Sequence, residues 1–206
     1  MKCFVIAALA LVLASCVMSG QKVELSPQVR SEGGDGGRGK EIVVTVVDAR
    51  ANKVIGVRDP DLGRLTSITA VDGLEDNALR AVAKGLTEEG FRVVAAPPGT
   101  SVAADALRHL TVEIVALGYK ADLDSVPKTI TCSAEVRAVA QNNGHGLERT
   151  FKVSGDRKVV LTPSEADNES ALADILSEAL TNAVSDYELT SFMSKEMLRT
   201  KKIEAN

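Results

Sequence analysis

The residues best suited to undergo chemistry lie near the N-terminus. Leu13, Ala14, Ser15 and Cys16 form a run typical of a bacterial lipobox, with an aliphatic residue, two small residues and a cysteine. Diacylglycerol alkylates such a thiol. Signal peptidase, recognising Leu13, Ala14 and Ser15, then cleaves before Cys16 and frees an amine for a third chain such as palmitate. Two or more acyl chains anchor a protein stably, because each buried methylene contributes about 0.8 kcal/mol. The alternative is a plain secretory signal with an incidental cysteine.

The segment before the lipobox also indicates export. Lys2 supplies a positive charge, and residues 4–13 are apolar throughout. This length matches the apolar core of a signal peptide, whereas a membrane-spanning helix needs about 20 residues. We therefore expect residues 1–15 to be a lipoprotein signal peptide. Val17, in place of the aspartate that retains enterobacterial lipoproteins in the inner membrane, favours the outer membrane, facing the periplasm.

Asp48 and Arg50 form a second pair of chemically capable residues. They follow a continuous β-branched run, residues 42–47, which predicts a strand buried on both faces. Side chains two apart in an extended chain point to the same side. Asp48 and Arg50 are therefore a possible binding pair for a ligand or partner, or else a local ion pair.

The other reactive side chains predict little chemistry. His109 and His145 lack the spacing of paired metal ligands. Cys132 falls on the apolar side of an alternating strand, where a thiol is a small buried hydrophobic group. The sequence contains neither a nucleophile elbow nor a phosphate-binding loop. We expect no catalysis, metal or cofactor, and a hydrolase with a site hidden from sequence remains a further hypothesis.

Composition excludes several classes of protein. With 206 residues, 45% hydrophobic and 25% charged, the chain predicts one globular domain and not a disordered polymer. The formal charge of -4 argues against general nucleic-acid binding. Trp is absent and only 2 Tyr and 4 Phe occur, too few for a platform that stacks on bases or sugars.

A short tether and a folded domain must position the chemically capable residues named above. Residues 16–40, with the lipidated Cys16 and a glycine-rich stretch at 33–39, predict a flexible tether. Val23–Pro27 is an alternative edge strand within it. Residues 41–206 are expected to form a periplasmic α+β domain.

Hydrophobic periodicity predicts three strands, a helix, four strands and two helices in the domain. The first helix is expected to start with Asp72 and Glu75 as a capping box and to end at Gly90. The second starts at Asp167 or Asn168, or at Thr162–Glu165, and the third at Ser185. The order favours a mainly antiparallel sheet with the helices packed on one face.

Asn143-Gly144 predicts a two-residue hairpin between two long strands. The implied register places Val136 opposite Phe151 and pairs Glu135 with Lys152 on the other face. Arg149 is the exception, because it falls on the apolar face.

The expected mature chain resembles the YajG-type family of bacterial lipoproteins. The resemblance rests on the order of several segments: the lipobox, Val23–Pro27, Val46–Arg50, Ile55-Gly56, Leu86–Phe91, the paired long strands and the leucine-rich C-terminal helix. It implies an outer-membrane-anchored periplasmic α+β domain and transfers no catalytic residue.

The sequence thus favours a lipid-anchored accessory protein of the bacterial envelope, contacting the membrane through its N-terminus and an envelope protein through a sheet edge or helix. The alternative is a module that binds a small ligand or cell-wall fragment through Asp48, Arg50 and the basic tail. That tail, Lys195, Arg199, Lys201 and Lys202, is also explained as cations at a helix C-terminus.

Overall fold

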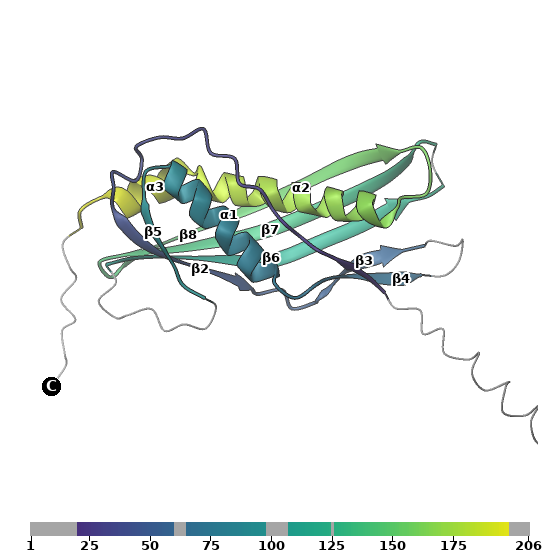
Figure 1. The fold of residues 1–206 in the computed structure, drawn as a ribbon, viewed down its shortest axis with the longest axis horizontal. Helices are drawn as coiled ribbons and strands as arrows, with labels where there is room; N and C mark the ends of the chain where they lie inside the picture. The colour runs from purple at the N-terminus through teal and green to yellow at the C-terminus, as the bar shows by residue number, and fades with distance from the viewer. Residues whose placement is uncertain (1–19, 60–64, 98–106, 125, 198–206) are drawn as a thin grey trace, which may run out of the picture.

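The structure is a computed structural model that describes residues 20–59, 65–97, 107–124 and 126–197. Over these residues, eight strands form one sheet and three helices cover one of its faces (Figure 1). The strands are β1 (Gln21–Val23), β2 (Glu41–Asp48), β3 (Val54–Arg58), β4 (Thr66–Ala70), β5 (Arg92–Ala95), β6 (Arg108–Asp122), β7 (Lys128–Asn142) and β8 (His145–Val159). The helices are α1 (Leu74–Glu88), α2 (Glu165–Val184) and α3 (Tyr187–Ser194).

Strand β6 is the centre of the sheet. Along one side it pairs with β7 over its whole length, and β7 pairs in turn with β8. Along its other side β6 pairs with β2 near its start, through His109 to Ile114, and with β3 near its end, at Tyr119. Strand β5 extends the sheet beyond β2, and β4 and β1 extend it beyond β3.

The prediction of a mainly antiparallel sheet is wrong, because the sheet is mixed. Of the seven strand pairings, four are parallel (β1–β4, β2–β5, β2–β6 and β3–β6) and three are antiparallel. Alternation in a sequence shows which side chains face a core, but it does not show the direction of the neighbouring strand. The overall α+β composition and the placement of the helices on one face agree with the prediction.

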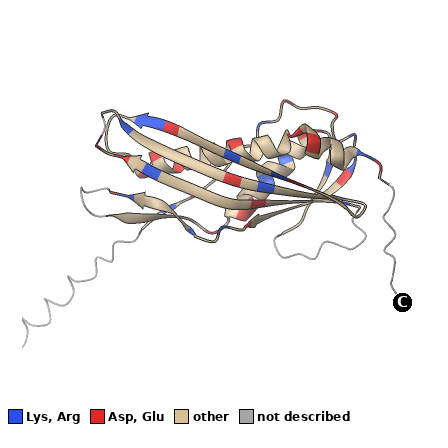
Figure 2. Ribbon diagram, turned by 180° about the vertical axis from the view of Figure 1, so that it is seen from behind, with Lys and Arg blue, Asp and Glu red and all other residues tan. Residues whose placement is uncertain are grey.

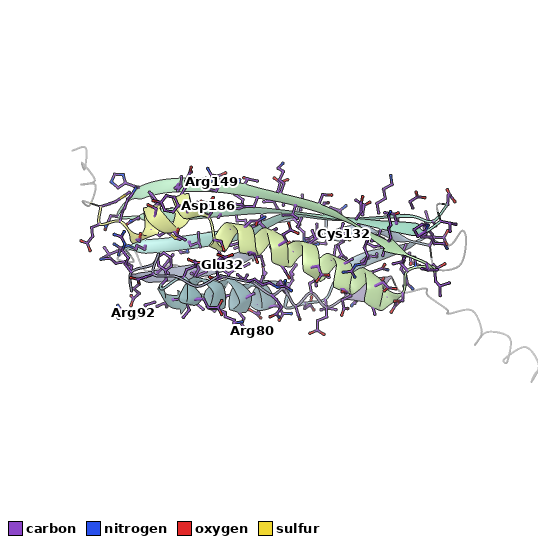
Figure 3. All side chains as sticks on the ribbon, turned by 90° about the horizontal axis from the view of Figure 1, so that it is seen from above. Glu32, Arg80, Arg92, Cys132, Arg149 and Asp186 are labelled. Carbon is purple, nitrogen blue, oxygen red and sulfur yellow. The ribbon has the colours of Figure 1, made fainter. Side chains whose placement is uncertain are left out.

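The predicted hairpin is confirmed. Val136 lies opposite Phe151, and Lys152 forms an ion pair with Glu135 at 3.0 Å. Asn143 and Gly144 both have positive φ, as a type I′ turn requires. Arg149 reaches the N-terminus of α3, where its guanidinium pairs with Glu188 at 2.7 Å and with the N-cap residue Asp186 at 3.3 Å, so carboxylates balance its charge (Figure 3).

The simple alternation of apolar residues Leu110, Val112, Ile114 and Ala116 predicts a strand that ends near Ala116, but β6 continues for six more residues to Asp122. Its register against β7 shifts between Ile114 and Ala116, which marks a β-bulge. The bulge changes the parity of the buried residues: even positions such as Ile114 are buried before it, and odd positions such as Leu117 and Tyr119 after it. A single-parity pattern therefore stops at the bulge, although the strand does not.

The helix starts differ in part from those predicted. The N-cap of α1 is Gly73, at φ 97°, and no side chain caps it, so the Asp72–Glu75 capping box is wrong. Ser164 caps α2 in a capping box with Asp167, close to the rival start at Thr162–Glu165. Asp186, not Ser185, caps α3.

Residues 21–31, here called the N-terminal strap, pack across the helices. Val23, Leu25 and Val29 are buried in the core. Backbone N–H groups donate to side chains of α2, from Glu24 to Glu169 at 3.0 Å, from Gln28 to Ser177 at 2.9 Å and from Arg30 to Thr181 at 3.1 Å. Two extended residues and four helical residues both advance by about 6–7 Å, so the two rows stay in step.

The expectation of a flexible tether is therefore wrong for residues 20–40. The glycine-rich part also packs closely, since Gly34 and Gly37 donate to the Glu88 and Glu89 carbonyls at 3.0 and 2.7 Å. An edge strand does form near this point, but it is β1 (Gln21–Val23), which shares only Val23 with the predicted segment Val23–Pro27. Cys16 and the signal segment lie outside the described residues.

The sheet face opposite the helices is polar. Figure 2 shows basic and acidic residues interspersed along its long strands. Many are paired across strands: Arg137 bonds Glu113 from the neighbouring β6, and Thr131 donates to Asp156 of β8 at 2.7 Å. Such pairs satisfy the polar side chains of this face in water.

A substitution at Gly56 tests the close contact between β3 and β6. A Cβ at this position would lie 2.4 Å from the Tyr119 carbonyl oxygen, so Gly56→Ala must push the two strands apart. We expect the free energy of unfolding in urea to fall by about 1–3 kcal/mol. Gly146→Ala is the matched control, because its Cβ would meet only the Ala140 carbonyl, at 4.0 Å. Equal effects of the two substitutions would contradict the close contact.

Candidate functional site

Asp48 and Arg50 meet where β2 ends. The guanidinium of Arg50 binds the carboxylate of Asp48 through two hydrogen bonds, from Nε at 2.7 Å and from Nη2 at 2.9 Å. Lys53 adds an ion pair with the same carboxylate at 2.9 Å. The predicted proximity of Asp48 and Arg50 is thus observed, in the form of a local ion pair.

The pair is largely removed from water. The side chain of Arg50 is 3% exposed and that of Asp48 is 15% exposed. Burial alone would raise the pKa of Asp48, but hydrogen bonds from Arg50 and Lys53 and the charge of Arg50 outweigh it and lower the pKa to about 2. Asp48 is therefore ionised at neutral pH and serves as a hydrogen-bond acceptor, not as a general acid.

Glu75 extends this cluster from the first turn of α1. Its carboxylate accepts the backbone N–H of Asp48 at 2.7 Å, which ties α1 to the end of β2. An open cavity of about 450 Å³ lies beside the cluster, lined by Lys53, Glu75 and residues 70–74. Nη1 of Arg50 is buried without a partner among the described residues.

This geometry favours a structural role for Asp48 and Arg50. Both carboxylate oxygens of Asp48 already accept hydrogen bonds within the cluster. A ligand in the cavity would have to compete with Arg50 for Asp48, and separating a buried ion pair leaves an uncompensated charge. The cluster therefore joins β2 to α1 and does not offer a preformed binding pair.

The other reactive side chains lie apart from this cluster. Burial raises the pKa of Cys132 to about 11, so its thiol is protonated at neutral pH, as predicted for a small buried hydrophobic residue. His109 is half-buried, and its ring nitrogen contacts the Thr45 hydroxyl at 3.3 Å. Burial lowers the pKa of His109. His145 begins β8 at the hairpin turn. Within the described residues, no group of His, Cys, Asp and Glu could hold a metal ion.

Two features of the site were missed from the sequence. No pattern in the sequence links Lys53 to Asp48, and the sequence predicts Glu75 as part of a helix cap. A buried polar chain was missed as well: the Tyr119 hydroxyl donates to Asn168 at 2.7 Å, and Asn168 donates to Gln21 at 2.9 Å. Burial raises the pKa of Tyr119 to about 12, which keeps it a donor. Its sequence signal was an asparagine within an apolar helix face.

The long outer edge of β8 is a separate candidate surface. Strand β8 has 15 residues, and among the described strands it pairs only with β7. One edge of β8 therefore presents backbone N–H and C=O groups to solvent, the arrangement that β-augmentation uses. Thr150 and Ser154 are exposed along it, whereas α2 and α3 pack above the sheet face (Figure 3).

The family of the chain follows from comparison with known sequences. A family model described as "Uncharacterized lipoprotein" matches residues 27–194, which is most of the chain. The protein belongs to this lipoprotein family, and the match fits the YajG-type resemblance. None of the helices in the described residues has the length and apolar character needed to cross a membrane. A search among curated proteins finds no match.

Two solved structures share the fold at low sequence identity, and a third has a lower structural similarity. A Xanthomonas campestris protein of the DUF330 family is 14% identical, with a TM-score of 0.53, over 84% of this chain and 96% of that one. A neuraminyllactose-binding hemagglutinin homolog from Helicobacter pylori is 13% identical, with a TM-score of 0.50, over 85% and 100%. A minor lipoprotein from Acinetobacter baumannii is 13% identical, with a TM-score of 0.37, over 76% and 91%.

The Asp48 cluster predicts a specific loss of stability in acid. The pKa of Asp48 is about 2 in the folded state, against 3.8 for a free side chain, so the unfolded chain takes up the proton first as the pH falls. The resulting stabilisation, about 2 kcal/mol, is present above pH 4 and is lost between about pH 4 and pH 2. Urea unfolding of Asp48→Asn should show a correspondingly weaker dependence on pH over this range. An unchanged dependence would contradict the ion pair.

Proposed function

We propose that the protein is a lipid-anchored accessory protein of the bacterial envelope that binds another envelope protein along the edge of β8. In this proposal Cys16 carries the lipid, the outer membrane holds it, and the domain faces the periplasm. The protein performs no catalysis and needs no cofactor. Membership of a lipoprotein family supports the anchor, and the lipobox at Leu13–Cys16 identifies the residue.

The observation that carries the binding proposal is the 15-residue edge of β8. A partner strand added there would gain backbone hydrogen bonds without displacing any described element. The neighbouring sheet face is less suited to binding, because many of its charges are already paired, as Glu135 is with Lys152. Charged side chains on β8, such as Glu148 and Lys158, oppose indiscriminate edge pairing and favour a partner of complementary charge.

Binding of a small ligand or cell-wall fragment is the less favoured alternative. It would use the cavity beside Asp48 and Arg50, whose charged groups already bind one another. The basic tail is represented in the described residues by Lys195, whose backbone carbonyl accepts hydrogen bonds from Arg108 and Asn142. That segment is thus held against the start of β6 and the end of β7, away from the cavity.

Lipidation of Cys16 has a matched control within the chain. Cys16→Ser should abolish the diacylglyceryl adduct and leave an uncleaved precursor, because serine has no thiol to alkylate. Cys3→Ser should leave the adduct intact, since Cys3 lies in the segment expected to be removed. Intact-mass analysis of the membrane fraction distinguishes the two. An adduct that persists in Cys16→Ser would contradict the assignment.

Photo-crosslinking in living cells tests the β8 edge. We expect probes at Thr150 and Ser154 to give one discrete protein adduct, because both lie on the exposed strand. Arg80 is the control position, on α1 at the opposite side of the molecule (Figure 3). Adducts would be identified by mass spectrometry with the native Cys16 retained.

The pattern of adducts decides between the functions. The same protein adduct at Arg80 as at Thr150 would show non-specific capture and would contradict an edge interaction. Adducts to glycan alone at all three positions would support the cell-wall alternative instead.

A further inference from the structure

Five large apolar side chains, here called the apolar tip, are exposed at one end of the described structure. Val126, between β6 and β7, is 94% exposed, and Val160 and Leu161, after β8, are 83% and 78% exposed. Leu65, before β4, is 70% exposed, and Val57 in β3 is about half exposed. Scattered single residues of this kind are ordinary on a surface, but a group at one end indicates contact with another apolar phase.

Contacts between the connecting segments bring these residues to the same end. Lys128 donates to the hydroxyl of Thr162 at 3.0 Å, which joins the start of β7 to the segment after β8. Arg58, at the end of β3, forms an ion pair with Glu165 at 2.9 Å, so β3 ends beside the start of α2. In Figure 1 these ends lie together on the right.

The chain enters the described structure at this same end. Gln21 lies opposite Ile68 in the parallel pairing of β1 with β4, and its side chain donates to the Glu165 carbonyl at 2.9 Å. Gly20 abuts Ser67 near the start of β4. Four residues of extended chain reach about 14 Å, so Cys16 is confined to the neighbourhood of the apolar tip.

The opposite end of the molecule is beyond the reach of such an anchor. Helix α3 and the hairpin between β7 and β8 lie on the left of Figure 1. The 15 residues of β7 span about 50 Å from one end to the other. A lipid on Cys16 therefore brings the apolar tip to the membrane and keeps α3 distant from it.

The charges around the tip are mixed. Exposed cations and anions adjoin it in similar numbers: Lys120, Lys158, Asp122, Asp124 and Asp156. Electrostatic attraction to anionic lipid is therefore weak, and burial of apolar surface is the main source of any affinity for a bilayer. A bilayer of zwitterionic lipid is therefore sufficient to bind the tip.

We propose that the apolar tip inserts into the interfacial region of the leaflet that holds the lipid of Cys16. Strands β6, β7 and β8 then project from the membrane with the β8 edge accessible along their length. This inference rests on the proposed lipid anchor and adds an orientation to it. The occupant of the tip is a lipid bilayer, and neither a second copy nor a protein partner is needed to cover it.

Introduced tryptophan provides a direct test, because the chain contains no Trp. Val126→Trp and Leu161→Trp place one indole at the tip, and Tyr187→Trp is the control, an 80% exposed aromatic position at the start of α3. Each full-length lipidated variant is placed in phosphatidylcholine vesicles whose acyl chains carry bromine. We expect both tip variants to lose about half of their emission or more, because interfacial side chains reach about 5–10 Å into the bilayer. The control should keep its emission.

Flotation of the same vesicles separates the two proposals. If the protein floats but the tip emission is quenched no more than that of Tyr187→Trp, the proposed orientation is wrong and the lipid anchor still holds. A blue-shifted but unquenched tip emission shows burial against protein, such as a second copy, and overturns the orientation too. Protein that does not float overturns the lipid anchor and, with it, the basis of the orientation.

Discussion

The length of β6 is the constraint on which the rest of the architecture depends. At 15 residues it is about twice as long as β2 and three times as long as β3, so two short strand groups fit end to end along one of its sides. The other side is filled by β7, which has the same length. The β-bulge between Ile114 and Ala116 allows this arrangement. It shifts the residues that face the helices from even to odd positions, and the odd positions that follow, such as Leu117 and Tyr119, are buried. The first half of β6 thus supports the segment that ends in the Asp48 cluster, and the second half supports β3.

The helix layer is completed by the strap and not by helices alone. Val29 packs against Gly85 of α1, where a larger residue would overlap it, and the strap hydrogen bonds run along α2. Glycines that suggested a free tether in fact permit close backbone approach, as at Gly37 beside Phe91. The buried chain from Tyr119 through Asn168 to Gln21 fixes the first described residues to β6 and α2. The direction in which the chain leaves the fold is therefore set by specific contacts.

Much of the fold could be predicted from periodicity, and the failures have physical causes. Order and type of the elements after residue 40, the hairpin register and the burial of Cys132 all follow from local patterns. Parallel pairing does not, because the partner of a strand is decided by long-range packing. The β-branched run of β2 was nevertheless a signal, since strands in parallel sheets read as continuous apolar runs. The Asp48–Arg50 contact followed from their spacing, but the contributions of Lys53 and Glu75 required the fold that brings β2 and α1 together.

The placement of polar groups separates the surfaces by what each is able to bind. On the open sheet face, many charged side chains are paired across strands, so a partner that used these groups would have to break existing pairs. In the Asp48 cluster the opposite charges are also paired with one another, and the side chains of Asp48 and Arg50 are largely buried. Along the outer edge of β8, which has no neighbouring strand among those described, the groups available for strand pairing are backbone N–H and C=O groups. In the proposed orientation this edge runs for about 50 Å away from the membrane, so a strand added to it would extend outward from the leaflet that carries the anchor. In this proposal, recognition would depend on strand geometry and on the flanking charges of β8, and it would not require a preformed ligand site.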